Sequence, residues 1–365
     1  MTGFSTPARE LGLGIVLLGL ALTLACSAPQ TAGPAPADAT AERPAEADAQ
    51  PAQSPPAARQ PMTPEALERR MNSIVDATVE RMAGAEAVPQ IGYEDVLTEA
   101  KEAFPQAQIE DVEVPGAGVL MRAWMVKPPP GIPIRATILA LHPWQSNRGF
   151  ALKQFGFLLQ YGYQLFIPDA RSNAFIGNGD SFNAYLREDL ADLRRIMQYL
   201  ETRRDVGTIA TYGCAWGGLK AILVAAQHPR VRAVISDAGT LHYGLILVDY
   251  MNRMPPEARR DWNLVNKFID KVRSRLKTRL GYDIDQFDPR DAVARLNRPL
   301  LIVHGTDDTF VPIQVSEEVY RTARKPKSFL RGDNFGHCNG MQQDPAKYVP
   351  GVLVFLERHL PRRER

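Results

Sequence analysis

The sequence has few cysteines, almost no net charge and no cluster of metal-ligating residues, and each absence excludes a class of protein. Three cysteines in 365 residues are too few for a domain held together by disulfide bonds. Histidine, cysteine and acidic residues do not recur at the spacings of a metal site, so we expect no metal and no cofactor. A formal net charge of +2, without a basic stripe interleaved with aromatic residues, argues against nucleic acid as a partner.

An uncharged apolar stretch lies near the N-terminus, where Leu11–Ala25 follows Arg9 and ends at Cys26. It has the length of the apolar region of a signal peptide and is short for a membrane-spanning helix. Its last residues, Leu22–Cys26, resemble a bacterial lipobox. That resemblance implies that residues 1–25 are a lipoprotein signal peptide, removed before lipidation of the Cys26 thiol.

The expected location is therefore the cell envelope, with the N-terminal lipid as the contact with the membrane. Ser27, and not aspartate, follows the cysteine, which favours the outer membrane in a bacterium that has two. The alternative is an ordinary secretory signal with an incidental cysteine.

The next two segments differ in composition. Residues 26–62 are rich in Ala and Pro and have almost no large apolar side chains, so they cannot bury enough surface to fold and should form a disordered tether. Residues 63–108 should be a helical segment, in which Thr63 caps a helix with Pro64 at its first position.

From residue 109 the pattern changes to that of a sheet. Two strands around Pro115–Gly118 predict a hairpin. Continuous apolar runs then alternate with helical patterns, which is typical of a mostly parallel sheet covered by helices on both faces. Residues 109–365 are therefore expected to be one α/β domain. The predicted strands of the domain are 109–114, 120–126, 136–141, 164–168, 208–212, 233–237, 300–304 and 328–331.

One interval between two of these strands, residues 241–295, is unusually long and mostly helical in pattern. It is either a lid-like insertion over the carboxyl edge of the sheet or a plain long crossover, and the residues do not decide between the two.

The segment Gly213–Gly218 reads G-C-A-W-G-G and directly follows an apolar strand. It matches the G-x-S-x-G turn that presents a nucleophile between strand and helix, except that Ala215 occupies the nucleophile position. The turn requires small residues at the positions two before and two after the nucleophile, and Gly213 and Gly217 satisfy that requirement.

This order of elements, with four further motifs, resembles the α/β-hydrolase superfamily, especially its dienelactone-hydrolase-like and prolyl-oligopeptidase-like branches. The resemblance covers about residue 109 to the C-terminus. The four motifs are Leu141–Trp144, Pro168–Arg171, His304–Pro312 and Phe335–His337.

The resemblance implies that Asp308 is the acid and His337 the base of a catalytic triad, with Ala215 at its inactive nucleophile position. Asp307 is the competing acid. The backbone N–H groups of Trp144 and Trp216 are the implied oxyanion donors, and their side chains either line a pocket or pack in the core. Among the other histidines, including His304, only His142 and His242 are expected to face the pocket.

Cys214 is the alternative nucleophile, in a frame shifted by one residue. The positions two before and after it are Tyr212 and Trp216, which are too large for the turn, so we expect Cys214 to be a buried thiol. Cys338 follows the expected base directly. We predict two independent thiols in preference to a disulfide between Cys214 and Cys338.

A methyl group cannot attack a carbonyl, so Ala215 excludes covalent acyl transfer at that position. The favoured hypothesis is an envelope lipoprotein that binds a small apolar or carbonyl-bearing ligand without serine hydrolase activity. One alternative is a general-base enzyme in which Asp308 and His337 activate water. The other is an esterase-like hydrolase whose natural residue at position 215 is serine.

Overall fold

The computed structural model describes residues 62–83, 93–116, 120–144, 146–170, 186–239 and 243–360. The predicted signal peptide, Cys26 and nearly all of the predicted tether lie outside these residues. Within the described ranges, no helix is both long and apolar enough to cross a membrane.

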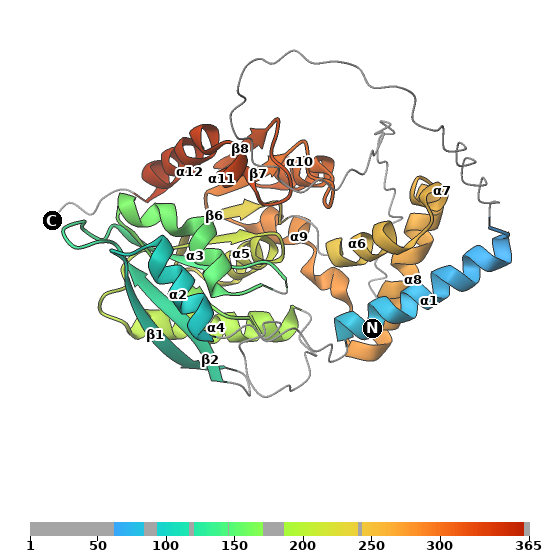
Figure 1. The fold of residues 1–365 in the computed structure, drawn as a ribbon, viewed down its shortest axis with the longest axis horizontal. Helices are drawn as coiled ribbons and strands as arrows, with labels where there is room; N and C mark the ends of the chain where they lie inside the picture. The colour runs from blue at the N-terminus through green and yellow to red at the C-terminus, as the bar shows by residue number, and fades with distance from the viewer. Residues whose placement is uncertain are drawn as a thin grey trace, which may run out of the picture. The chain divides into compact units, whose positions relative to one another are not determined.

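The core of the domain is one eight-stranded sheet with the order β1-β2-β4-β3-β5-β6-β7-β8 (Figure 1). The pairs β1–β2 and β2–β4 are antiparallel, and all other pairs are parallel. The mostly parallel sheet and the hairpin that begins it are thus confirmed. The strands are β1 (Gln108–Pro115), β2 (Leu120–Lys127), β3 (Ala136–Leu141), β4 (Tyr163–Pro168), β5 (Ile209–Cys214), β6 (Val231–Asp237), β7 (Leu300–Gly305) and β8 (Lys327–Gly332).

The central strands are buried along their whole length because helices cover both faces of the sheet. Every residue of β3, β4, β5 and β7 is buried. Alternate residues of β3 enter different clusters: Leu139 and Leu141 join one apolar cluster, and Ile138 and Ala140 join the other. Continuous apolar runs, without polar alternation, are the expected sequence of such strands.

Each apolar cluster is completed by its own set of helices (Figure 1). The cluster of Ile138 and Ala140 also contains side chains from α2 (Tyr93–Ala103), α3 (Arg148–Phe155) and α12 (Pro345–His359). The cluster of Leu139 and Leu141 also contains side chains from α4 (Arg187–Thr202), α5 (Trp216–Gln227), α9 (Pro289–Arg295) and α10 (Ile313–Thr322). The short helices are η1 (Gly156–Tyr161), η2 (Ile284–Phe287) and α11 (Gly340–Gln343).

The long interval between β6 and β7 is helical, as expected, and contains α6 (Gly244–Arg253), α7 (Pro256–Arg259) and α8 (Trp262–Leu280). The N-terminal helix α1 (Pro64–Ala83) packs against α6 and α8. Thr63 begins α1 as predicted, because its hydroxyl accepts a hydrogen bond from the backbone N–H of Ala66 at 3.2 Å. The insertion therefore forms one apolar packing unit with the N-terminal helix.

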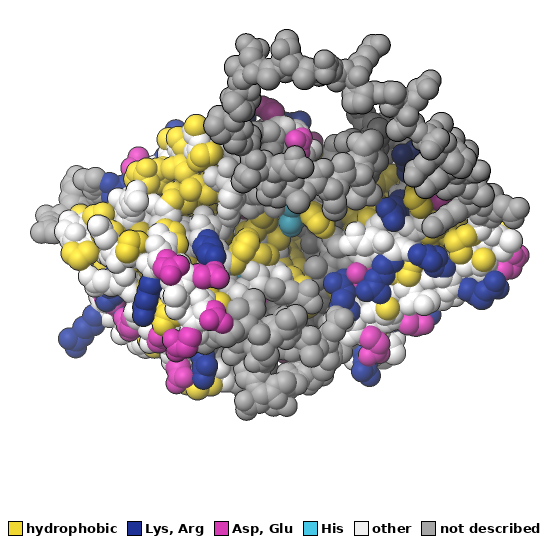
Figure 2. Space-filling view, in the orientation of Figure 1, with side chains coloured by type: hydrophobic (Ala, Val, Ile, Leu, Met, Phe, Trp, Pro, Cys, Tyr) yellow, Lys and Arg dark blue, Asp and Glu magenta, His cyan; other side chains and the backbone are white. Residues whose placement is uncertain are grey.

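Polar contacts at every fourth residue join α1 to α8. Because both series rise together along the chain, the two helices run parallel. Lys and Arg side chains gather over these helices in Figure 2, with acidic side chains beside them. The pairs are Glu68 with Lys267 (2.8 Å) and Lys271 (2.7 Å), Asn72 with Lys271 (2.8 Å), Asp76 with Arg275, and Glu80 with Arg279 (3.9 Å).

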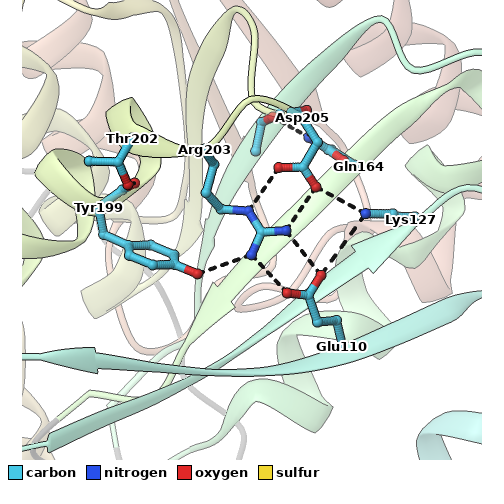
Figure 3. A network of polar contacts seen from close by, with 8 residues as sticks. Glu110, Lys127, Gln164, Tyr199, Thr202, Arg203 and Asp205 are labelled. Carbon is cyan, nitrogen blue, oxygen red and sulfur yellow. Dashed lines mark hydrogen bonds and ion pairs between the residues drawn. The ribbon is translucent and has the colours of Figure 1, made fainter.

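A second ionic network fixes the β1–β2 hairpin to the rest of the sheet (Figure 3). Arg203, which follows α4, donates to both oxygens of Asp205 at 2.8 Å and to both oxygens of Glu110 on β1 at 2.8 and 3.0 Å. Lys127 on β2 pairs with Asp205 at 2.9 Å. Tyr199 bonds the remaining side of the guanidinium at 3.0 Å. The network therefore connects the first two strands to the loop that leads into β5.

Candidate active site

The turn between β5 and α5 has the strained backbone of a nucleophile elbow. Ala215 has φ 50° and ψ −118°, a conformation that costs a non-glycine residue about 1–3 kcal/mol. Its N–H donates to the carbonyl of Asp237 at 2.8 Å, which fixes the turn to the end of β6. The alanine therefore occupies the apex that a nucleophile requires, although it has nothing to attack with.

Close packing explains the glycines on either side of this apex. A Cβ atom added to Gly213 would lie 2.1 Å from the carbonyl oxygen of Gly217, and one added to Gly217 would lie 2.1 Å from that of Leu141. Both contacts involve backbone, which cannot move aside cheaply. The elbow thus packs directly against the end of β3, where the expected oxyanion loop begins.

The structure brings Asp308 and His337 together. Nδ1 of His337 lies 2.7 Å from Oδ2 of Asp308, and the other carboxylate oxygen accepts the backbone N–H groups of Phe310 and Val311, both at 2.8 Å. Asp307, the competing acid, is exposed and its side chain is bonded to Thr306. Asp308 is therefore the aspartate that can orient the base.

The Asp308 carboxylate is fully buried but stays ionised. Burial by itself would raise its pKa, and hydrogen bonds from His304 and His337 outweigh that effect, so the pKa lies well below its usual value. His304 was expected to be a scattered histidine, which is wrong: its Nε2 lies 3.0 Å from Oδ2 of Asp308. The four-residue spacing within the motif was the available signal, but contact depends on how the loop after β7 folds back.

His142, which was expected to face the pocket, has both ring nitrogens bonded within the protein. It is buried, its Nδ1 donates to the carbonyl of Pro143 at 2.7 Å, and its Nε2 accepts the N–H of Ala170 at 3.0 Å. Burial first, and then the charge of Lys220, lower its pKa to about 3. His142 therefore holds two loops together as a neutral ring. The other histidine expected at the pocket, His242, lies outside the described residues.

The two expected oxyanion donors belong to neighbouring residues. Trp144 follows β3 and Trp216 begins α5, so the N–H of Trp216 lies at the positive end of a helix. Their indole rings meet edge to face, with centroids 5.5 Å apart and planes at 87°. Both side chains pack on the apolar cluster that includes the insertion. The two tryptophan side chains therefore pack as part of the core, which is one of the two expected arrangements.

Cys214 and Cys338 form a disulfide, with Cα atoms 5.9 Å apart, so the prediction of two independent thiols is wrong. The bond joins the residue before Ala215 to the residue after His337. It therefore holds the loop of the base against the elbow, and it also removes Cys214 as a nucleophile. Among the described residues, no three His, Cys, Asp or Glu side chains are grouped so that they could hold a metal ion.

Comparisons with known proteins support the same fold. No family model matches the chain. The uncharacterized protein YqkD of Bacillus subtilis is 23% identical over 224 residues, which cover 60% of this chain and 71% of YqkD.

Solved structures are similar over a larger part of the chain. An esterase of Pyrococcus furiosus has a TM-score of 0.55 at 17% identity, covering 74% of this chain and 97% of the esterase. The 2,6-dihydroxy-pseudo-oxynicotine hydrolase has a TM-score of 0.53 at 18% identity, covering 81% of each chain. The acylaminoacyl peptidase of Pyrococcus horikoshii has a TM-score of 0.52 at 17% identity, covering 75% of this chain and 45% of the peptidase. The chain has the α/β-hydrolase fold.

Proposed function

We propose that this protein binds a small apolar or carbonyl-bearing ligand and does not catalyse hydrolysis through an acyl-enzyme. The observation that carries the proposal is Ala215 at the apex of an otherwise complete elbow. An acyl-enzyme needs a side-chain oxygen or sulfur at that apex, and the sulfurs of Cys214 and Cys338 are joined to each other in a disulfide.

The strain of the elbow supports a retained binding role. A φ of 50° at Ala215 persists only where the surrounding structure imposes it, and here Gly213 and Gly217 allow the required close packing. The neighbouring N–H of Trp216 begins a helix, where the dipole favours a carbonyl oxygen or an anion. A carbonyl group seated there would lie against the two tryptophan rings.

A general-base enzyme is the second candidate, and the Asp308–His337 pair favours it. Nδ1 of His337 is bonded to Asp308 at 2.7 Å, which leaves Nε2 as the basic nitrogen of the neutral ring. His337 is partly exposed, so water can reach it. A water molecule in place of the missing hydroxyl would then attack a bound ester directly.

The two candidates are separated by comparing the wild type with Ala215→Ser, His337→Ala and the double variant on short p-nitrophenyl esters. The binding proposal predicts equal, background rates for the wild type and His337→Ala. Because removing a triad nucleophile typically costs on the order of a million-fold, Ala215→Ser should gain at least about a thousand-fold, and the double variant should lose this gain.

Wild-type turnover that disappears in His337→Ala would instead establish the general-base enzyme. The binding proposal also predicts that a small molecule accompanies the natively purified wild-type protein in native mass spectrometry. No retained mass, and no ligand found for either the wild type or Ala215→Ser, would contradict it.

We further propose that the protein is anchored at the cell envelope through a lipid on Cys26. The lipobox-like sequence at Leu22–Cys26 supports this. The full chain expressed in a bacterium should carry acyl groups on its N-terminal peptide by mass spectrometry, and Cys26→Ala should abolish them. An unmodified N-terminal peptide in the wild type would contradict the anchor.

A further inference from the structure

His304 is a second histidine on the acid of the candidate site. It lies near the end of β7 and is almost completely buried. One ring nitrogen, Nε2, lies 3.0 Å from Oδ2 of Asp308 and 2.9 Å from the carbonyl oxygen of Val311. The other, Nδ1, is bonded to the hydroxyl of Ser316 on α10. Every polar atom of the ring therefore has a partner.

These partners fix the tautomer of the ring. The carbonyl oxygen of Val311 can only accept a hydrogen bond, so Nε2 of His304 must carry a proton. In a neutral ring Nδ1 is then an acceptor, and the Ser316 hydroxyl donates to it. The proton on Nε2 is directed at the carbonyl of Val311, and Oδ2 of Asp308 lies 3.0 Å from the same nitrogen, so the positive N–H of His304 also acts on the carboxylate.

Asp308 consequently has four polar contacts, two on each oxygen. Its Oδ1 holds the backbone N–H groups of Phe310 and Val311. Its Oδ2 is shared between His337 at 2.7 Å and His304 at 3.0 Å. Rotation of the carboxylate would break the hydrogen bonds from Phe310, Val311 and His337.

Sharing one oxygen between two imidazoles has an electrostatic consequence for His337. The attraction of Asp308 for a proton on His337 is weakened when the N–H of His304 also lies against Oδ2, because the carboxylate charge is already partly neutralised.

We propose that His304 is a positioning residue that acts on His337 through the shared Oδ2 of Asp308, so that His337 is a weaker base than it would be in a simple Asp–His pair. The inference goes beyond the proposed function, because it concerns the resting protein and holds whether the site binds or catalyses. Asp237, at the end of β6, is a further titratable group that acts on His337. Asp237 is unchanged in the experiment below.

The test is the pKa of His337, measured on the full-length chain by NMR of the ring signals after isotope labelling of histidine. The chain has six histidines, so single substitutions assign each signal. His304→Phe keeps the ring volume and removes the donor. We expect the pKa of His337 to rise by about half a unit to one unit.

Two further variants separate positioning from general loosening of the fold. His304→Gln can place an N–H near Oδ2 and should restore most of the wild-type pKa. Thr211→Val is the matched control, since it removes one buried hydrogen bond, from Thr211 to the carbonyl of Ala221 at 3.1 Å, in the same sheet but away from Asp308. It should leave the pKa of His337 unchanged.

If His304→Phe does not fold, Ser316→Ala provides the measurement. It removes the donor to Nδ1 of His304 while keeping the ring, and it should raise the pKa of His337 by a smaller amount. An unchanged or lowered pKa in whichever of these two variants folds would overturn the proposal. So would a shift of equal size in Thr211→Val, because the effect would then be structural only.

Discussion

Replacing Asp237 by asparagine should stabilise the folded protein at neutral pH. Asp237 ends β6 and is buried. Its Oδ2 accepts the hydroxyl of Tyr348 at 2.7 Å, and Tyr348 is bonded in turn to the hydroxyl of Tyr212. An asparagine can keep the acceptor for Tyr348, so the substitution removes the charge and little else.

The magnitude follows from the pKa of Asp237. Burial raises it from its usual 3.8 to about 6, against the opposing hydrogen bond from Tyr348. The folded state thus keeps a proton that the unfolded chain has already lost, so the free energy of unfolding falls as pH rises from about 4 to about 6. A difference of about two units, at 1.36 kcal/mol each, corresponds to on the order of 3 kcal/mol. Asparagine does not titrate and should lose none of this stability.

The assay is chemical denaturation of the wild type and Asp237→Asn from about pH 4 to about pH 8. The free energy of unfolding of Asp237→Asn minus that of the wild type should be near its minimum at the acid end of this range. It should grow with pH to a plateau above about pH 6.5. Asp308 titrates with the opposite sign, because its pKa is lowered, but it is present in both proteins and cancels in the difference.

Asp307→Asn, at an exposed neighbouring position, is the control and should show no such pH-dependent gain. The reasoning would be refuted by a difference between wild type and Asp237→Asn that does not change with pH. It would equally be refuted if Asp237→Asn were the less stable protein at the upper end of the range.

Two further predictions concern the packing of the elbow and the ionic network of the hairpin. Gly217→Ala should lower the free energy of unfolding by more than about 2 kcal/mol, since the new Cβ would lie 2.1 Å from a backbone oxygen. Gly207→Ala is the control and should be nearly neutral, because nothing lies within 4 Å of the new Cβ. Equal losses of stability for the two variants in denaturant titrations would contradict the steric argument. Arg203→Leu should lower the free energy of unfolding by about 1–2 kcal/mol at low salt and by less at high salt. Arg331→Leu, which removes an exposed ion pair with Glu317, should lower it by under about 0.5 kcal/mol. A loss for Arg203→Leu that does not depend on salt would mean that packing, and not charge, is responsible.

Much of the fold could be predicted from the sequence because its signals are local. Runs such as 136–141 and 300–304 are apolar at all but one residue, Thr137 and His304 respectively, and strands that are buried on both faces have that pattern. The glycines around Ala215 were equally informative, because the steric demand of the elbow acts over five consecutive residues. Thr63 and Pro64 marked the start of α1 because the signals that begin a helix also depend on adjacent residues.

Contacts between distant residues were not predictable in this way. The choice of Asp308 over Asp307 as the partner of His337 rested on motif spacing, and the structure shows the physical reason: Asp308 points inward and its neighbour points to solvent. The disulfide between Cys214 and Cys338 spans 124 residues, and no local rule gives the distance between two such thiols.

The sequence by itself therefore determined the positions of the strands along the chain, the shape of the elbow and the absence of a nucleophile at its apex. The tertiary structure alone decided which groups surround that apex: the disulfide beside it, the second histidine on Asp308 and the buried Asp237 with its two tyrosines. Backbone conformation and strand burial depend on residues adjacent in the chain. Hydrogen bonds, charges and thiols near the site depend on the ends of β5, β6 and β7 meeting at one edge of the sheet.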